Sequence, residues 1–334
     1  MGECLITRRG GEAYELPILN SAYPANVTVV QAANASASFN VQIATPGKPA
    51  EYTYQWYLNG VKISGATNSS YTKTGLTAAG THTLYCVVTN KAGTVTSRVA
   101  TLTVKSAKPT YTYTGSHQLI DDGNYNWRIK LKTSGTLRFT DLGNGANGIN
   151  VFCVGGGGGG GYNYGGGGGG GYTKTSAKTV TANTNYAVVV GAGGAGTTDN
   201  NTDGGRGGTS SAFGVSADGG VGGGSYHGSN YRNGGAGGSG GGGGSSGTSG
   251  AGGTNGSNGG GASGAAFNGS GGQGQGTTTK EFGESTGTLY ASGGAGGNGS
   301  TGSANTGNGG GGTPYQSSAA HAGSSGIVVI RNKR

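Results

Sequence analysis

Hydrophobic and polar residues alternate with a period of two through much of the first 154 residues, a spacing typical of half-buried β-strands. The alternation is clearest at Phe39, Val41, Ile43, Leu84, Cys86 and Val88. Further short strands are expected at 111–113, 127–131, 136–139 and 149–154, with reversals at Asp122-Gly123 and 143–145. No long apolar pattern has the helical period of 3.6 residues. We therefore expect an all-β protein.

After residue 154 the apolar residues contract into short islands within a glycine tract. The chain holds 82 glycines in 334 residues, and 67 of them lie between Gly155 and Gly326. The islands fall at 186–190, 210–215, 288–291 and 327–331. Such apolar runs are not expected in a flexible Gly/Ser linker, because they aggregate when they are left exposed. We therefore expect the tract to fold.

The glycine spacing limits how the tract can fold. Blocks of five to seven consecutive glycines exclude collagen, which needs glycine at strictly every third position. Extended left-handed helices with three residues per turn remain compatible with the sequence. Without side chains their backbones can approach on every side, so hydrogen bonds between neighbours can replace a packed core. The residues between the blocks would then form loops at the ends of a bundle.

Several segments carry a resemblance to a known class of proteins. Residues 134–139, 149–154 with the following block 155–161, 186–194 and 325–331 resemble the glycine-rich domains of bacteriophage tail proteins. They are also similar in style to the receptor-binding adhesins at the fibre tips of T-even-like phages. This resemblance, over about residues 115–334, implies a polyglycine II helix bundle that displays variable loops.

Residues 23–105 carry a second resemblance. The segments around Trp56 and Cys86 resemble the C and F strands of immunoglobulin-like (Ig-like) domains, with Trp56 as the buried indole. The partner cysteine of that fold is absent near Val41, and Leu84 replaces the expected tyrosine. We expect a disulfide-free Ig-like β-sandwich in which Cys86 packs as a small apolar residue.

These features predict a three-part organisation. Residues 1–21 form an N-terminal docking segment, and residues 22–106 form the Ig-like β-sandwich. Residues 107–334 form the glycine-rich domain, with β-strands over 107–154, the polyglycine II bundle and its loops over 155–326, and a closing strand with a basic tail over 327–334.

The resemblance and the loop composition predict a virion protein of the phage tail or fibre that binds a host receptor, either a glycan or an outer-surface protein. Tyrosine suits such a surface because a rigid ring supplies contact area and its hydroxyl still forms hydrogen bonds. Other virion proteins are expected as partners of the N-terminal segment, and homo-oligomer formation stays open. The candidate receptor-binding residues are Tyr162, Asn163, Tyr164, Tyr226, His227, Tyr231, Arg232, Phe267, Tyr315 and His321.

The formal net charge of +9 does not predict nucleic-acid binding. Residues 155–326 carry equal numbers of acidic and basic residues, so the excess lies outside the glycine tract. Arg128, Lys130 and Lys132 alternate as the solvent face of a strand would. The N-terminus lacks the apolar core of a signal peptide, and no stretch is long enough to span a bilayer. We expect a soluble chain made in the host cytoplasm.

Catalytic motifs are not evident. G-x-G-x-x-G matches arise by chance in such a tract, and the P-loop and H-E-x-x-H patterns are absent. The histidines are isolated and the three cysteines are widely spaced, so no enzyme activity, cofactor or metal is predicted. A calcium site at Asp199 and Asp203 is a weaker alternative.

Two other functions remain open. One is a structural fibre, spacer or capsid or tail decoration protein that does not contact a receptor. The other is ice binding by a polyglycine II protein, although that function needs flat, regular faces and the insertions here are long and aromatic.

Overall fold

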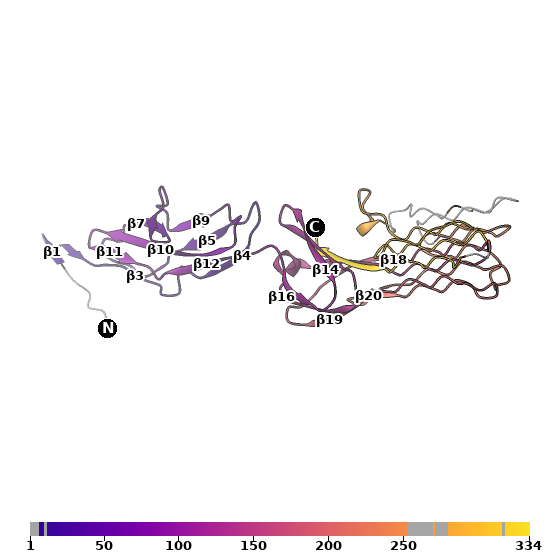
Figure 1. Cartoon of the computed structure of the whole chain (residues 1–334). Helices are drawn as coiled ribbons and strands as arrows, with labels where there is room; N and C mark the ends of the chain where they lie inside the picture. The colour runs from indigo at the N-terminus through magenta and orange to yellow at the C-terminus, as the bar shows by residue number, and fades with distance from the viewer. Residues whose placement is uncertain (1–6, 10–11, 253–269, 271–279, 316–317) are drawn as a thin grey trace. The chain divides into compact units, whose positions relative to one another are not determined.

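The computed structural model describes residues 7–9, 12–252, 270, 280–315 and 318–334. The chain divides into two compact units, Met1–Lys108 and Pro109–Arg334, which run from indigo to purple and from magenta to yellow in Figure 1. Among the described residues, the helical elements are limited to the short 3₁₀ turns η1 (Gly143–Asn147) and η2 (Glu281–Gly283). The predicted all-β class is confirmed.

The first unit contains one six-stranded sheet and three two-stranded ones. The large sheet has the order β4-β12-β10-β7-β8, with β11 also paired to β10, and the small sheets are β1-β2, β3-β6 and β5-β9. The strands are β1 (Thr7–Arg9), β2 (Glu12–Tyr14), β3 (Ile18–Leu19), β4 (Val27–Val30), β5 (Ala37–Asn40), β6 (Ile43–Thr45), β7 (Thr53–Leu58), β8 (Val61–Lys62), β9 (Ser70–Lys73), β10 (Gly80–Asn90), β11 (Gly93–Thr96) and β12 (Ala100–Lys105).

The core of this unit lies between the large sheet and β5-β9. Trp56 on β7 stands opposite Cys86 on β10, and both are fully buried, as the sequence predicted. The indole ring lies 6.2 Å from that of Tyr71 on β9, and its N–H donates to the Asn68 carbonyl at 2.9 Å. Burial raises the pKa of the Cys86 thiol to about 11, so this cysteine packs as an apolar side chain.

Part of the predicted docking segment belongs to this unit. Glu15 and Lys48 exchange backbone hydrogen bonds at 2.9 Å, and β3 pairs with β6. Residues 15–21 are therefore ordered against the sandwich of their own chain.

The second unit begins with two five-stranded sheets, in the orders β13-β16-β19-β20-β21 and β14-β15-β22-β17-β18. Their strands are β13 (Thr110–Tyr113), β14 (His117–Gly123), β15 (Asn126–Leu131), β16 (Gly135–Asp141), β17 (Ile149–Val154), β18 (Thr173–Lys178), β19 (Asn185–Val189), β20 (Ser210–Ala212), β21 (Val215–Ala217) and β22 (Ile327–Asn332).

Two sequence predictions of local structure were wrong in this unit. Asp122-Gly123 ends β14 instead of forming a turn, and the reversal falls at Asn124 and Tyr125, which have φ of 50° and 63°. Residues 288–291 do not form a strand; Leu289 makes only an isolated bridge to Lys280. Exposed polar strands such as β14 and β18 were missed because they lack the apolar alternation on which the prediction rested.

Strands β17 and β22 lie next to each other in the middle of one sheet and are buried on both faces. One face packs against the other sheet through Val151, Cys153, Val328 and Ile330. On the opposite face, Phe152 and Val329 pack with Tyr290, Ala291 and the half-buried Phe282. This double burial explains why both strands appear in the sequence as continuous apolar runs.

Beyond the sheets, the glycine segments are held by hydrogen bonds that repeat every three residues. In segment 155–161, the N–H groups of Gly156 and Gly159 donate to segment 205–208. Those of residues 157 and 160 donate to segment 321–324, and those of residues 158 and 161 to segment 166–169, all at 2.8–2.9 Å. Consecutive residues thus bond to different neighbours, as a chain with three residues per turn does.

The two seven-glycine blocks occupy the centre of this bundle. Hydrogen bonds join 155–161 to neighbours at 166–169, 194–197, 205–208, 220–223, 310–313 and 321–324. The other block, 165–171, is bonded in the same way to 158–161, 221–224, 235–242, 294–297 and 307–310. A Cβ atom built at Gly159 would lie 2.0 Å from the Ala195 carbonyl oxygen, so no side chain fits there. Uninterrupted glycine is what this central position requires.

Several outer segments carry exposed side chains at a spacing of three residues. Ala192 and Ala195 are three residues apart and exposed, as are Arg206 and Thr209. One turn of three residues places each pair on the same side of its segment. This three-residue spacing appears in the sequence as Gly-Gly-X triplets. Our prediction rested on the lengths of the glycine blocks and did not use it.

Candidate functional site

Several of the loops that join the glycine segments lie at the end of the bundle remote from the two sheets (Figure 1). Segment 155–161 continues from β17 and segment 165–171 returns to β18, so Tyr162, Asn163 and Tyr164 form the turn between them. We call the surface formed by residues 162–164, 197–203, 225–232, 245–246 and 313–315 the tip.

Hydrogen bonds join the tip loops to one another. The backbone N–H of Tyr162 donates to Ser225 Oγ at 2.8 Å, and that of Asn163 donates to Thr313 Oγ1 at 3.2 Å. The amide Nδ2 of Asn163 donates to Asn200 Oδ1 at 2.9 Å. Loops that lie up to 150 residues apart in sequence therefore form one connected surface.

Asp203 organises the longest of these loops. One carboxylate oxygen accepts from the Ser225 N–H at 3.0 Å, and the other accepts from Ser229 Oγ at 2.7 Å. The second oxygen also accepts from the N–H and the side-chain amide of Asn230, at 3.2 and 2.9 Å. Asp203 thus orders a loop more than 20 residues away in the sequence.

Arg232 lies at the centre of a group of tyrosines. Its guanidinium carbon is 4.0 Å from the ring centroid of Tyr226, 5.6 Å from that of Tyr164 and 5.7 Å from that of Tyr231. One guanidinium nitrogen, Nη1, donates to the Ser245 carbonyl at 3.1 Å. Only 8% of Arg232 is exposed, whereas Tyr231 is half exposed. The arginine holds the rings in place, and the rings form the outer surface.

Further aromatic contacts extend this group across the tip. Tyr226 lies 4.2 Å from the ring of His227 and 6.3 Å from that of Tyr231. Tyr164 meets Tyr315 edge to face at 5.8 Å, and Tyr315 is 58% exposed. The tip therefore presents a continuous group of tyrosines from three separate loops.

Two pairs of tip residues adopt backbone conformations that favour glycine. The φ angles are 56° for both Asn163 and Tyr164, 33° for Tyr231 and 59° for Arg232. Each such conformation costs a bulky residue about 1–3 kcal/mol and persists only where its surroundings impose it. In a chain with 82 glycines, these positions nevertheless carry large side chains.

The structure thus brings together most of the residues predicted from the sequence. His321 makes none of these contacts: its ring nitrogen Nδ1 is 3.1 Å from Thr301 Oγ1, and its carbonyl accepts from the Gly160 N–H at 2.9 Å. Phe267 lies outside the described residues. The candidate residues that meet at the tip are Tyr162, Asn163, Tyr164, Tyr226, His227, Tyr231, Arg232 and Tyr315.

Residues 132–333, which contain the bundle and most of its sheet framework, match a family model described as a glycine-rich domain. The chain belongs to this glycine-rich domain family. No curated protein matches the chain.

The glycine-rich domain is completed by strands that precede the matched region. β15 ends at Leu131 and pairs with β22, and β13 pairs with β16. The compact unit accordingly begins at Pro109.

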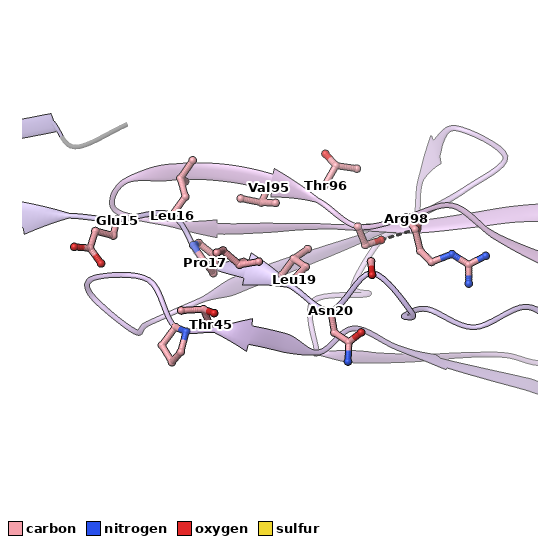
Figure 2. Close-up of a pocket in the computed structure, with 13 residues that line it drawn as sticks. Glu15, Leu16, Pro17, Leu19, Asn20, Thr45, Val95, Thr96 and Arg98 are labelled. Atoms are coloured by element: carbon pink, nitrogen blue, oxygen red, sulfur yellow. Dashed lines mark hydrogen bonds between the residues drawn. The ribbon is translucent and has the colours of Figure 1, made fainter. Parts of the chain in front are cut away.

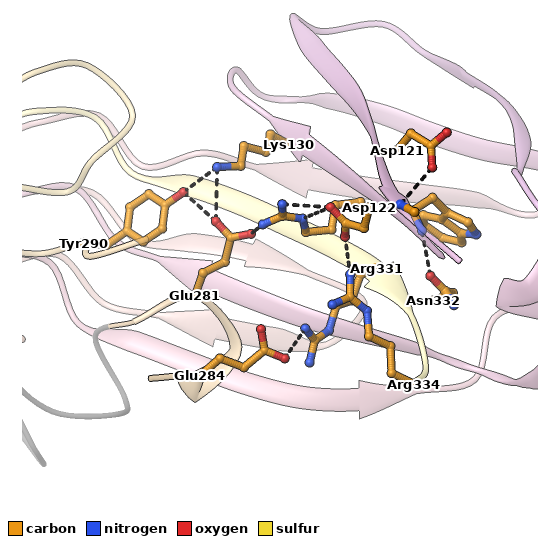
Figure 3. A network of polar contacts seen from close by, with 12 residues as sticks. Asp121, Asp122, Lys130, Glu281, Glu284, Tyr290, Arg331, Asn332 and Arg334 are labelled. Atoms are coloured by element: carbon orange, nitrogen blue, oxygen red, sulfur yellow. Dashed lines mark hydrogen bonds and ion pairs between the residues drawn. The ribbon is translucent and has the colours of Figure 1, made fainter. Parts of the chain in front are cut away.

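At the sheet end of the glycine-rich domain, a buried carboxylate fastens residues 280–291 to the sheet (Figure 3). Glu281 is 1% exposed and pairs with Arg128 at 2.5 Å and Lys130 at 3.1 Å, while Tyr290 donates its hydroxyl to it at 3.0 Å. Burial alone would raise the pKa of Glu281, but the attraction of Lys130 and Arg128 outweighs it and lowers that pKa. Glu281 was not predicted, because nothing local in the sequence links it to a strand 150 residues earlier.

The prediction that Arg128 and Lys130 face solvent was wrong. Their side chains are only 27% and 18% exposed because they meet the segment that carries Glu281. Arg128 also pairs with Asp122 at 2.8 Å, and Asp122 contacts Arg334. Strand alternation correctly placed the two cations on one face, but it could not show that another segment covers that face.

The first unit has an apolar groove of about 590 Å³ (Figure 2). It lies between β3 and β11 and is lined by Leu16, Pro17, Leu19 and Val95, with Ile18 61% exposed. Exposed apolar surface of this kind is characteristic of contact sites. The lining includes residues 15–21 of the segment that the sequence predicted to dock.

Across the described residues, His, Cys, Asp and Glu side chains nowhere gather in a group of three or more that could hold a metal ion. No helix in the described part of the chain has the length and apolar character needed to cross a membrane.

Proposed function

We propose that this protein is a bacteriophage tail or fibre protein that binds a receptor on the host surface through its tip. The observation that carries the proposal is the set of large side chains at Asn163, Tyr164, Tyr231 and Arg232, held in conformations that glycine would adopt at lower cost. Strain of this kind clusters at functional sites. Tyrosines with small polar neighbours are also the composition of adaptable binding surfaces.

The glycine bundle serves the tip as a rigid support. We infer that its segments are polyglycine II-type helices, because their hydrogen-bond partners repeat every three residues. None of the glycines in 155–161 and 165–171 has a φ between 20° and 160°. Hydrogen bonds on all sides of the central blocks hold the loop ends at fixed spacing, which reduces the entropy lost on binding.

The first unit is proposed to be an Ig-like spacer. Its support is the burial of Trp56 against Cys86 at the centre of a two-layer β core. The apolar groove lined by Leu16 and Ile18 is the surface through which the docking to other virion proteins, expected of residues 1–21, would occur.

Adsorption tests the proposal. The purified full chain should bind cells of the phage host and block infection, and the variant Y164A/Y226A/Y231A should do neither. The matched control is Y57A/Y85A, which removes a stacked tyrosine pair from the first unit. Calorimetry of both variants separates loss of binding from loss of folding.

The outcomes distinguish the alternatives. Equal adsorption by the triple variant and the wild type would leave the spacer or decoration role in place of receptor binding. Thermal hysteresis in the wild-type protein would favour ice binding instead.

A further inference from the structure

Arg232 is a buried cation without a buried anion to neutralise it. It is 8% exposed, yet no carboxylate of the described residues forms an ion pair with it. Its Nε is buried and has no hydrogen-bond acceptor. Within the described structure, the only hydrogen bond of the guanidinium is the one from Nη1 to the Ser245 carbonyl. The stretches 253–269, 271–279 and 316–317 contain no Asp or Glu.

A second arginine of the same unit provides an internal comparison. Arg331 is 7% exposed and its guanidinium lies 4.1 Å from the ring centroid of Phe282, so burial and ring stacking match those of Arg232. Arg331 also pairs with Glu284 at 2.5 Å. Burying a charge is costly unless it is paired, and stacking on aromatic rings offsets only part of that cost. Arg232 lacks the carboxylate partner that Glu284 provides to Arg331.

The acidic residues of the tip do not fill this role. Asp203 uses its oxygens to hold residues 225–230, and Asp199 accepts from Asn201 and Thr202 within its own exposed loop. The guanidinium therefore keeps unused donors. The half-exposed ring of Tyr231 lies beside them, with its centroid 5.7 Å from the guanidinium carbon.

We propose that Arg232 receives the oxyanion, a carboxylate or a phosphate, of an acidic saccharide on the host surface. The inference rests on the proposed receptor-binding function and names the chemistry that the receptor presents. The guanidinium donates two parallel hydrogen bonds to an oxyanion in the fork geometry that gives Arg–carboxylate and Arg–phosphate pairs their strength. Rotation of Tyr231 opens the edge of the guanidinium to the ligand.

The rings around Arg232 favour a saccharide over an acidic peptide. A pyranose ring that carries a charged group in its own plane can lie across Tyr231 or Tyr226 while the charge reaches the guanidinium edge-on. An aspartate or glutamate side chain brings the same charge on a narrow, flexible stem and leaves the ring faces uncovered. Aromatic faces beside an arginine therefore suit a flat ligand with an anionic edge.

The test measures binding of the full chain by titration calorimetry to four probes of similar length. These are an oligoglucuronate, its carboxyl-reduced neutral counterpart, a phosphorylated glucan and an acidic peptide. We expect one or both anionic saccharides to bind and the neutral one not to bind. R232Q should weaken that binding about 10- to 100-fold, the range for losing a hydrogen bond to a charged group. The matched control R206Q changes an exposed arginine on the flank of the bundle and should leave binding unchanged.

A second variant, Y231A, tests the inference independently of whether R232Q folds. Y231A keeps the guanidinium but removes the half-exposed ring, so it should weaken saccharide binding while the melting temperature stays close to that of the wild type. The comparison of glucuronate with phosphorylated glucan tells which oxyanion is bound.

Equal binding of the neutral and anionic saccharides, binding of the peptide alone, or no binding of either anionic saccharide would overturn the inference. If the chain still blocks adsorption in any of these cases, the proposed function stands without it. If the chain neither binds host cells nor blocks infection, the proposed function itself fails.

Discussion

The centre of the glycine bundle should not tolerate even one methyl group, and Gly159→Ala is the sharpest test. The added Cβ would lie 2.0 Å from the Ala195 carbonyl oxygen and 2.4 Å from its carbon, whereas ordinary contact begins at 3.4 Å. Both atoms belong to backbone that is itself hydrogen-bonded, since Ala195 accepts from Gly205 at 2.7 Å. Relief therefore requires moving a whole segment, not rotating a side chain.

The loss of folding free energy caused by Gly159→Ala can be estimated. Overpacking a well-packed core typically costs about 1–3 kcal/mol and occasionally more. Here a backbone shift also breaks hydrogen bonds to neighbouring segments, so we expect about 3 kcal/mol or more for Gly159→Ala. For a unit of this size each kcal/mol lowers the melting temperature by about 2–4 °C, so the expected shift is about 6–12 °C.

The matched control is Gly205→Ala on the adjacent segment. Its Cβ would meet Ala195 N at 3.0 Å, so only a small adjustment is required. Alanine also reduces the entropy of the unfolded chain by an equivalent of about 0.4–1 kcal/mol, which offsets part of the cost. We expect this variant to stay within about 1 kcal/mol of the wild type.

Differential scanning calorimetry of the full chain is the assay. The chain has two compact units, so the transition of the glycine-rich unit should shift in Gly159→Ala while that of the first unit stays in place. Equal melting temperatures for Gly159→Ala and Gly205→Ala would refute the argument that backbone contact leaves no room at the centre.

Three other outcomes can be measured on the same chain. Because the pKa of Glu281 is lowered on folding, its contribution to stability is present above its unfolded pKa of about 4.3 and is lost as the pH falls through the folded value. Acid melts should therefore show a steeper loss for the wild type than for Glu281→Gln, and parallel curves would contradict this. Burial raises the pKa of the thiols of Cys86 to about 11 and of Cys153 to about 12. At pH 8 a thiol reagent should therefore label at most one of the three cysteines until the protein unfolds, and rapid labelling of two would count against the buried packing. Trp56→Ala should cost about 3–5 kcal/mol and lower only the transition of the first unit, whereas a shift confined to the second would argue against separate cores.

Much of the framework could be predicted from the positions of apolar residues in the sequence. The runs that became β17 and β22, and the burial of Trp56 and Cys86, follow from apolar residues that must leave water. The loops of the tip were predicted as interruptions of glycine. The sequence could not show which of these loops lie next to one another. Asn163 and Thr313 are 150 residues apart in sequence and are joined only by the way the segments stack.

The sequence by itself determined that the fold is all-β and that the glycine tract needs backbone contacts in place of a core. These conclusions hold because glycine has no side chain to bury and because apolar strands must be covered. Only the tertiary structure decided that the two longest blocks lie at the centre, that Glu281 is buried beside Arg128, and that Arg232 is enclosed by tyrosines without a carboxylate. Such contacts join residues far apart along the chain, and a local sequence pattern carries no record of them.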